Sequence, residues 1–251
     1  MTSLKDKIKI VTTTFYRLDN RVDTIRAKIA ERTIRSISDL GYETIVVDGG
    51  SADELLDSFR RSGAVVYHEE ERGMGKARRQ AIRIACERNP QVLIWTEPEK
   101  ESYVRFIEAT ALPILNNATD MVIPRRRDIS SYPALQQITE RAGNLFWKKL
   151  TGTDLDMFFG ARGWRKDLSK YFLEYNAAYG DKQDSIHISI LNIIHAGYRV
   201  SGVDIDFTYP HEQRAIEEEM GGEMDLKRMQ QLYELSRITQ EHWLKLSGQK
   251  K

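Results

Sequence analysis

Two acidic segments directly follow short apolar runs, where their carboxylates would face a ligand. The first, TIVVDGGSADE, places Asp48 before a glycine turn, and the second, LIWTEPEKE, places Glu97 and Glu99 on either side of Pro98. A carboxylate at the carboxyl end of a parallel strand points into the crevice where open α/β sheets bind ligands. Asp48 there would accept hydrogen bonds from a nucleobase or ribose. Two such glutamates suit Mg²⁺ or Mn²⁺ at a diphosphate, because hard cations prefer carboxylate ligands. Alone, each segment is equally typical of an ordinary strand exit.

A glycine-containing basic segment, ERGMGKARRQAI, opens a predicted helix. The free amides and the positive dipole end of a helix favour phosphate, and Lys76, Arg78 and Arg79 follow the two glycines at once. The segment is not a Walker loop, and it lacks the G-x-G-x-x-G dinucleotide fingerprint. A phosphate site and a solvated basic turn are therefore both open interpretations.

The elements that must position these residues alternate through the first half, in the pattern of βαβ units. The predicted strands are Ile8–Thr13, Glu43–Asp48, Gly63–Tyr67, Val92–Thr96 and Asp120–Ile123. Helices are predicted over about residues 22–40, over a short segment that Ser51 or Asp53 would cap, and over about residues 75–88. Short apolar runs of this kind suit strands covered on both faces, which predicts an α/β fold with a mostly parallel sheet.

The second half is less regular. A helix is predicted over Ser131–Leu150, with a buried stripe of Leu135, Ile138, Ala142, Leu145 and Phe146. Further predictions are a strand over Met157–Phe159, a buried helix over Asp184–His195, a strand over Arg199–Phe207 and a helix over Met224–Leu246. The apolar stripe of the last helix packs either on its own domain or on a second copy, which would give a homo-oligomer. We expect one domain over residues 1–251.

The composition excludes several classes of protein. The chain has 251 residues, with 38 Lys and Arg against 37 Asp and Glu, and this balance argues against an electrostatically driven nucleic-acid binder. A single cysteine, Cys86, cannot form an internal disulfide, which favours a reducing compartment. The first fifteen residues lack the apolar core of a signal peptide, and no stretch reaches the roughly 20 apolar residues of a membrane helix. A cytoplasmic protein without a membrane span is expected.

Taken in order, these motifs resemble the GT-A nucleotide-sugar glycosyltransferases, most closely the family 2-like enzymes with a V-D-D-G-S-x-D segment, with some likeness to mannosylglycerate synthases. The resemblance covers residues 7–100 clearly and residues 120–214 more loosely. It implies a GT-A fold with a nucleotide-sugar-binding half over about residues 1–120 and an acceptor half over about residues 120–215. A C-terminal helix over residues 223–247 would follow.

The resemblance also implies roles for residues of the first half. Those of the nucleotide-sugar site would be Thr13, Thr14, Phe15, Asp48, Lys76, Arg79 and Glu97. Glu99 would bind a divalent metal, Mg²⁺ or Mn²⁺. Two positions depart from the family pattern: Gly49 replaces the second aspartate of D-D, and glutamates replace both aspartates of D-x-D.

Downstream, the same resemblance implies the remaining roles. His211 would be a further metal ligand, its alternative being a surface histidine at a helix start. Inverting members need a carboxylate base, for which Asp184 and Asp181 are the candidates, although Asp184 is also a suitable helix N-cap. A retaining enzyme needs no such base.

Acceptor binding is expected from basic and acidic side chains after the fifth strand. The run Arg125–Arg127 suits an anionic acceptor or a phosphate, or else forms a solvated turn. The acceptor candidates are Arg126, Arg127 and Asp156, with Arg162 and Arg165 as weaker basic candidates.

The sequence therefore predicts an enzyme, a glycosyltransferase that moves a sugar from a nucleoside diphosphate sugar to a small or soluble acceptor. The expected sugar is a hexose. The acceptor is expected to be polar, and an anionic acceptor would suit the arginine run. One alternative is a catalytically inactive nucleotide-sugar-binding protein. Another is a nucleotidyltransferase, against which the first loop, TTTFYRLDN, counts because it contains no glycine.

Overall fold

The computed structural model describes residues 3–248, whose strands form one seven-stranded sheet. The strands are β1 (Ile8–Thr14), β2 (Glu43–Asp48), β3 (Ala64–His68), β4 (Val92–Trp95), β5 (Met121–Arg126), β6 (Arg162–Arg165) and β7 (Val200–Ile205). Their order across the sheet is β3-β2-β1-β4-β6-β5-β7, and β6 alone among them runs antiparallel to its neighbours. The predicted mixed, mostly parallel α/β sheet is confirmed.

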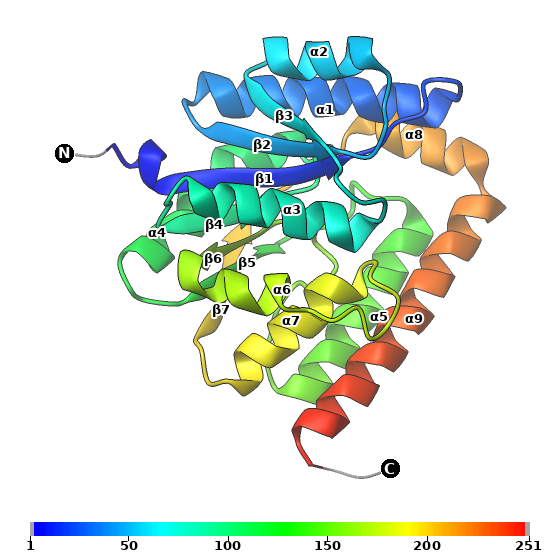
Figure 1. Cartoon of the computed structure of the whole chain (residues 1–251). Helices are drawn as coiled ribbons and strands as arrows, with labels where there is room; N and C mark the ends of the chain where they lie inside the picture. Colours follow the sequence, from blue (N-terminus) through cyan, green and yellow to red (C-terminus); the bar gives the residue numbers. More distant parts are fainter. Residues whose placement is uncertain (1–2, 249–251) are drawn as a thin grey trace.

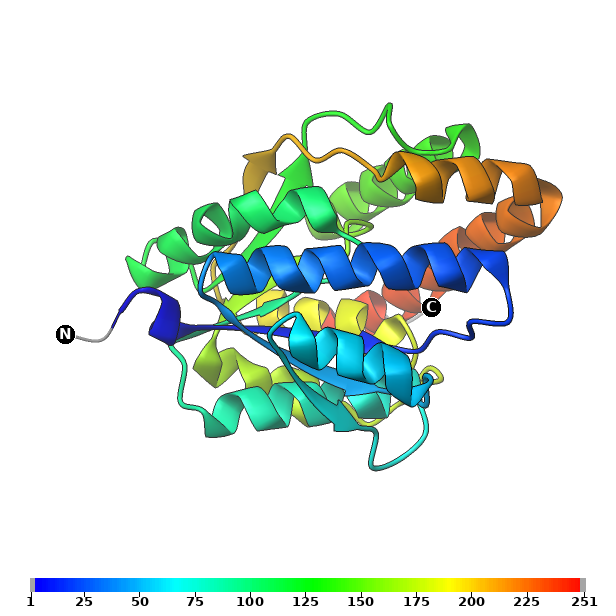
Figure 2. The same ribbon diagram turned by 90° about the horizontal axis from the view of Figure 1, so that it is seen from above.

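Helices cover both faces of this sheet (Figures 1 and 2). In chain order they are α1 (Arg21–Asp39), α2 (Asp53–Arg61), α3 (Met74–Glu87), α4 (Ile107–Leu115), α5 (Ala134–Thr151), α6 (Ser169–Leu173), α7 (Asp184–His195), α8 (His211–Met220) and α9 (Gly222–Leu246). Short 3-10 helices span Lys5–Lys7, Glu101–Phe106 and Lys166–Leu168. On one face α3, α6 and α7 pack over the sheet, and α1, α2 and α4 cover the other.

The strands are buried on both sides because their side chains alternate between two cores. In β4, Leu93 and Trp95 belong to the core under α3 and α7, whereas Val92 and Ile94 belong to the core under α4. This alternation explains why the sequence shows continuous apolar runs rather than a polar–apolar pattern. Helix α1 ends where Gly41 takes a left-handed φ of 81°, as its position after the apolar stripe predicts.

Three local predictions are wrong. Residues 157–160 form a turn, and the neighbouring strand is Arg162–Arg165 rather than Met157–Phe159. Strand β5 extends through Arg126, so two of the three arginines lie in the strand and not in a turn after it. Helix α2 begins after Ala52 without a side-chain cap, because the Ser51 hydroxyl donates instead to Asp48.

The predicted buried stripe of α5 is also wrong, since this helix turns its polar side inward. Ile138 and Leu145 are 64% and 58% exposed, while Gln136 and Glu140 are buried. Helix α9 packs against α5 (Figure 1) and presents the exposed side chains of Leu226, Met229 and Tyr233. No helix within residues 3–248 is long and apolar enough to cross a membrane.

Candidate functional site

The carboxyl ends of the first four strands lie together at one edge of the sheet. The register pairs Thr14 with Asp48 and Asp48 with His68, and on the other side of β1 it pairs Val11 with Trp95. The segments that follow these strands carry most of the predicted donor-site residues. The parallel arrangement therefore brings the separate sequence motifs to a common edge, as the fold class requires.

Asp48 organises the loop after β2. It is fully buried, and its carboxylate accepts hydrogen bonds from the amides of Gly50 and Ser51 at 2.8 and 2.6 Å and from the hydroxyls of Thr14 and Ser51, both at 2.7 Å. Four donors fill the acceptor positions of one carboxylate. Asp48 thus fixes the loop in this structure, and its contact with a nucleobase stays a prediction.

The surface beside this loop offers the aromatic side chain of Phe15 and the carboxylate of Glu69. The sequence did not single out Glu69. Phe15 is 51% exposed at the exit of β1, directly after the half-buried Thr13 and the buried Thr14. A Cβ at Gly49 would lie 3.5 Å from both the Phe15 Cβ and the Glu69 Oε2. Glu69 follows β3 just as Asp48 ends β2, and this parallel position is the signal that could have identified it.

The start of α3 is covered by the loop before α7. The Gly75 amide donates to the Asp181 carbonyl oxygen at 3.0 Å, and a Cβ at Gly75 would lie only 2.0 Å from Asp181 Oδ1. Arg79 holds both carboxylate oxygens of Asp181, at 2.6 and 2.7 Å. Lys76 extends to the exposed Glu71 at 2.7 Å. Two predicted diphosphate ligands are therefore paired with acidic side chains of this chain.

Glu97 lies at the exit of β4, next to an ammonium group. Its Oε2 is 3.2 Å from the Nζ of Lys100. Burial is the largest influence on Glu97 and opposes its ionisation, but the charge and hydrogen bond of Lys100 and the charges of two arginines together outweigh it and lower the pKa of Glu97 to about 2. Lys100 is itself buried, with its Nζ 5.5 Å from the ring centroids of Tyr132, Phe159, Phe207 and Tyr209. A Cβ at Gly160 would lie 2.5 Å from the Glu97 carboxyl carbon, so a side chain at position 160 would displace the Glu97 carboxylate from this position.

Glu99 and His211 do not form a metal site in this structure. Glu99 is buried, where Oε1 accepts the Tyr16 hydroxyl at 2.8 Å and pairs with Arg26 at 2.7 Å. His211 is exposed at the start of α8, where the adjacent Glu212 pairs with Arg32. Within residues 3–248 no three His, Cys, Asp or Glu side chains are grouped to hold a metal. These two residues as they lie do not fit a metal held by protein ligands alone.

Asp184 stabilises the loop that precedes α7. Its Oδ2 accepts the Tyr175 hydroxyl at 2.5 Å and the Asp181 amide at 3.0 Å, and its Oδ1 accepts the Lys182 amide at 2.6 Å. The residue before the helix is Gln183, and it makes no capping bond. The N-cap interpretation of Asp184 is therefore wrong, and its role as a base stays a prediction.

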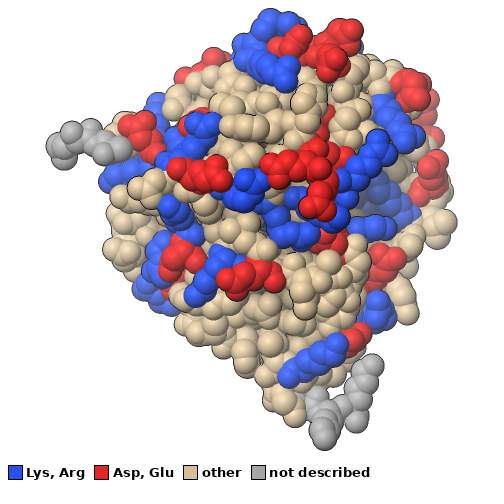
Figure 3. Space-filling view, in the orientation of Figure 1, with Lys and Arg blue, Asp and Glu red and all other residues tan. Residues whose placement is uncertain are grey.

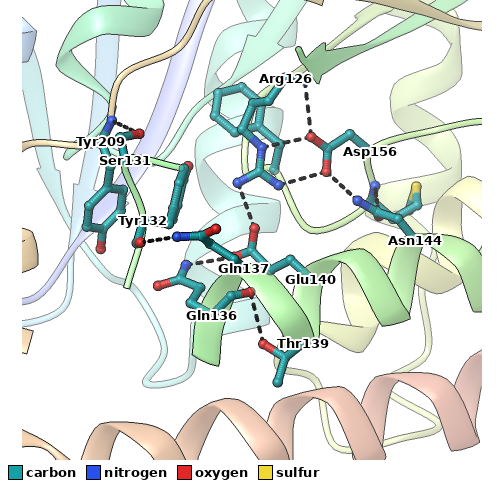
Figure 4. A network of polar contacts seen from close by, with 12 residues as sticks. Arg126, Ser131, Tyr132, Gln136, Gln137, Thr139, Glu140, Asn144, Asp156 and Tyr209 are labelled. Carbon is teal, nitrogen blue, oxygen red and sulfur yellow. Dashed lines mark hydrogen bonds and ion pairs between the residues drawn. The ribbon is translucent and has the colours of Figure 1, made fainter. Parts of the chain in front are cut away.

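Two of the predicted acceptor residues, Arg126 and Asp156, lie in a buried network (Figure 4). Arg126 Nε and Nη2 donate to Asp156 at 2.7 and 2.8 Å, while Nη1 lies 2.6 Å from Glu140 Oε2. Asn144 also donates to Asp156, at 2.7 Å. Burial lowers the pKa of Arg126, but the combined effect of Tyr132, Glu140 and Asp156 is larger. The pKa of Arg126 is therefore raised well above its usual range. Arg126 is thus joined to α5 directly through Glu140 and indirectly through Asp156 and Asn144, which explains the polar inner face of that helix. Arg127 is exposed and pairs with Asp206.

Charges of both signs lie side by side on the face shown in Figure 3. Most predicted cationic ligands have an acidic neighbour, as the pairs at Lys76, Arg79, Arg126 and Arg127 illustrate. Positive and negative charges are therefore paired locally as well as nearly equal in number.

A pocket of about 30 Å³ lies beside Glu97, between α3, β6, α7 and α9. Its polar lining includes Arg78, Arg162 and His187, each at least nine-tenths buried. The sequence indicates Arg162 only as a weaker acceptor candidate, and it does not single out His187. Because these residues lie far apart along the chain, the sequence alone does not indicate that they line one pocket.

The profile of Glycosyl transferase family 2 matches residues 20–177. An uncharacterised protein of Methanocaldococcus jannaschii is 27% identical over 119 residues, which are 47% of this chain and 49% of that protein. The chain thus spans about half the length of that curated relative.

Solved structures show the same fold. Glucosyl-3-phosphoglycerate synthase of Mycobacterium tuberculosis in complex with phosphoglyceric acid is 16% identical, with a TM-score of 0.66 over 98% of this chain and 81% of that one. The same enzyme in complex with Mg²⁺ and uridine diphosphate has a TM-score of 0.65 at 16% identity, over 98% and 80% of the two chains. At this identity the likeness establishes the fold alone.

Proposed function

Because the chain belongs to Glycosyl transferase family 2, we propose that it transfers a hexose from a nucleoside diphosphate sugar to a small polar acceptor with an anionic group. The observation that carries this proposal is the common edge of the sheet, where Phe15, the Asp48 loop, Lys76 and Glu97 follow parallel strands or open α3. The donor-binding half would be residues 1–120 and the acceptor half residues 120–215.

Each donor contact has a physical basis in the chain. The exposed Phe15 ring offers a surface on which a base can stack. Lys76 is exposed enough to exchange Glu71 for a diphosphate oxygen. Glu97 stays ionised at neutral pH, since the charge and hydrogen bond of Lys100 and the charges of two arginines together overcome the effect of burial and lower its pKa to about 2. It can therefore accept hydrogen bonds from sugar or ribose hydroxyls.

A divalent metal belongs to the proposal because related structures contain Mg²⁺ or Mn²⁺ with uridine diphosphate. In this chain Glu99 is held by Arg26 and Tyr16, so we assign no catalytic step to a metal. The same pairing favours the second candidate function, an inactive protein that binds nucleotide sugars.

Calorimetry with uridine and guanosine diphosphates, each with and without Mn²⁺, tests the proposal directly. Binding followed by hexose transfer from a uridine or guanosine diphosphate hexose to phosphoglyceric acid or glyceric acid is the expected result. Binding without transfer or donor hydrolysis would favour the inactive protein, and absence of nucleotide binding would reject both.

A homo-oligomer through α9 is a further part of the proposal, supported by the exposed Leu226, Met229 and Tyr233. Sedimentation should show a larger species that Met229→Lys dissociates. Leu112→Lys, on the exposed side of α4, is the matched control. A cytoplasmic location rests on the single cysteine of the sequence.

A further inference from the structure

Three buried polar side chains around the pocket beside Glu97 have atoms without hydrogen-bond partners among the described residues. Arg162 is 3% exposed, and its Nε and Nη1 have no acceptor. Arg78 is 7% exposed with an unpartnered Nε, and His187 is 6% exposed with an unpartnered Nε2. Buried polar groups in folded proteins are nearly always satisfied, so this concentration in one pocket points to a missing ligand.

The two arginines differ from other enclosed arginines of the same chain. Arg126 has Asp156 and Glu140 as partners, and Arg26 has Glu99. Arg78 donates instead to neutral groups, the Lys182 carbonyl oxygen and the Gln183 side chain, and Arg162 donates to the Phe159 carbonyl oxygen.

The surroundings of the pocket do not neutralise these charges. Burial lowers the pKa of Arg78 and of Arg162 to about 10. The acidic side chain on the pocket is Glu97, which is paired with Lys100 and not with either arginine. Two positive charges are therefore enclosed without a bonded counter-charge, a situation that an anionic ligand would relieve.

His187 adds a hydrogen-bond acceptor. Its Nδ1 is 3.2 Å from the Gln183 carbonyl oxygen, which can only accept, so Nδ1 carries the hydrogen. Burial lowers the pKa of His187 to about 3, and the nearby Arg162 charge acts in the same direction. The ring is neutral at pH 7, and Nε2 presents a lone pair that suits a ligand hydroxyl.

The size of the pocket limits the ligand. A volume of about 30 Å³ is room for about two water-sized groups. One carboxylate oxygen and a neighbouring hydroxyl match that space, whereas a nucleotide does not.

We propose that Arg78, Arg162 and His187 bind the carboxylate and the neighbouring hydroxyl of a small hydroxy acid. This inference rests on the proposed function, for which such an acid would be the acceptor. The carboxylate accepts from Arg78 and Arg162, and a ligand hydroxyl donates to His187 Nε2. Glu97 lines the same pocket, which sets the acceptor next to the expected donor sugar.

Thermal unfolding with added sodium glycolate, acetate or sulfate, each replacing chloride at constant ionic strength, tests the site without substrate turnover. We expect a saturable rise of the midpoint with glycolate, a smaller one with acetate and none with sulfate. Equal behaviour of all four anions would overturn the proposal, since the pocket would then hold water only.

Variants separate this site from general salt effects. Arg162→Met should abolish the saturable response without lowering the midpoint in chloride, because it removes an unpaired buried charge. Arg165→Met, three residues along β6, where the partly exposed Arg165 pairs with Asp120, should keep the response. An unchanged glycolate response in Arg162→Met would reject the assignment.

A second variant covers the case in which Arg162→Met fails to fold. His187→Phe should reduce the response to glycolate to that of acetate, since it removes only the hydroxyl acceptor. Continued preference for glycolate would contradict the role of Nε2.

Uridine diphosphate calorimetry on the same samples distinguishes the two proposals. Nucleotide binding without a carboxylate response overturns the pocket alone. A carboxylate response without nucleotide binding overturns the proposed donor and leaves the pocket as a carboxylate site.

Discussion

Arg79 and Asp181 form a two-point ion pair, with Nη1 and Nη2 of the arginine at 2.6 and 2.7 Å from the two carboxylate oxygens. The predicted diphosphate ligand and one predicted base are thus bound to each other. Because the Asp181 carbonyl oxygen also accepts from the Gly75 amide, a diphosphate can reach the start of α3 only if this loop yields.

Asp181→Asn tests that competition. Asparagine tolerates the left-handed φ of 62° at this position, so the substitution removes charge with little backbone strain. Arg79 then lacks its counter-charge, and affinity for uridine diphosphate should rise several-fold, measured by calorimetry. Asp206→Asn, which frees the exposed Arg127, should leave the affinity unchanged. An unaltered affinity in Asp181→Asn would remove Arg79 from the diphosphate site, and a collapse of kcat alone would support the base role.

Asp184→Asn distinguishes a structural carboxylate from a catalytic one. Asp184 accepts one hydroxyl and two amides while buried, so we expect a loss of about 1–3 kcal/mol in unfolding free energy. Urea denaturation measures this loss. Tyr175→Phe, which removes one of the three donors, should cost less. A variant with wild-type stability and a kcat lowered by orders of magnitude would instead support Asp184 as the base.

Glu99→Gln tests the predicted metal ligand. The change leaves Arg26 without its charged partner and should lower the unfolding free energy by about 1–3 kcal/mol. Glu101→Gln is the control, because its partner Arg32 is exposed and such pairs contribute at most about 1 kcal/mol. The effect of Mn²⁺ on nucleotide affinity should be the same in wild type and variant. Loss of that effect at wild-type stability would restore Glu99 as a ligand.

His187 makes stability depend on pH. Burial lowers the folded-state pKa of His187 to about 3. Below pH 6.5 the His187 side chain therefore binds a proton in the unfolded chain but not in the folded protein. The neutral ring therefore lowers the free energy of unfolding by nothing above pH 6.5. As the pH falls from 6.5 towards 3, the free energy of unfolding decreases by up to about 1.4 kcal/mol per pH unit. His187→Gln should flatten the urea midpoint between pH 6.5 and 5, whereas His211→Gln, at an exposed position, should not. Parallel profiles for wild type and His187→Gln would contradict the buried neutral ring.

The sequence predicted the sheet better than the site. Alternation of side chains between two cores makes strands such as Val92–Trp95 continuously apolar, and a single sequence shows this pattern directly. It also showed that Asp48 and Glu97 follow strands, hence that they share an edge.

The pairing of charges was beyond the sequence, because each pair joins distant segments. Arg126 lies in β5, with Asp156 in the turn before β6 and Glu140 in α5. The sequence does not show that contact, and for this reason the apolar residues of α5 are predicted to form its buried face. His187 is absent from the predicted site for the same reason, since Arg78 and Arg162 approach it only through the fold.

The position of β6 has a consequence for folding. This strand lies between β4 and β5 although it follows both in the chain, and β5 and β7 join the rest of the sheet only through it. The seven-stranded sheet therefore cannot be completed before β6 has been synthesised, whereas β1–β4 can pair earlier. Since long-range pairing slows folding, completion of the sheet should set the rate at which the protein matures. A ribosome-bound chain would expose the unpaired edge of β4 until residues 162–165 have emerged from the ribosome.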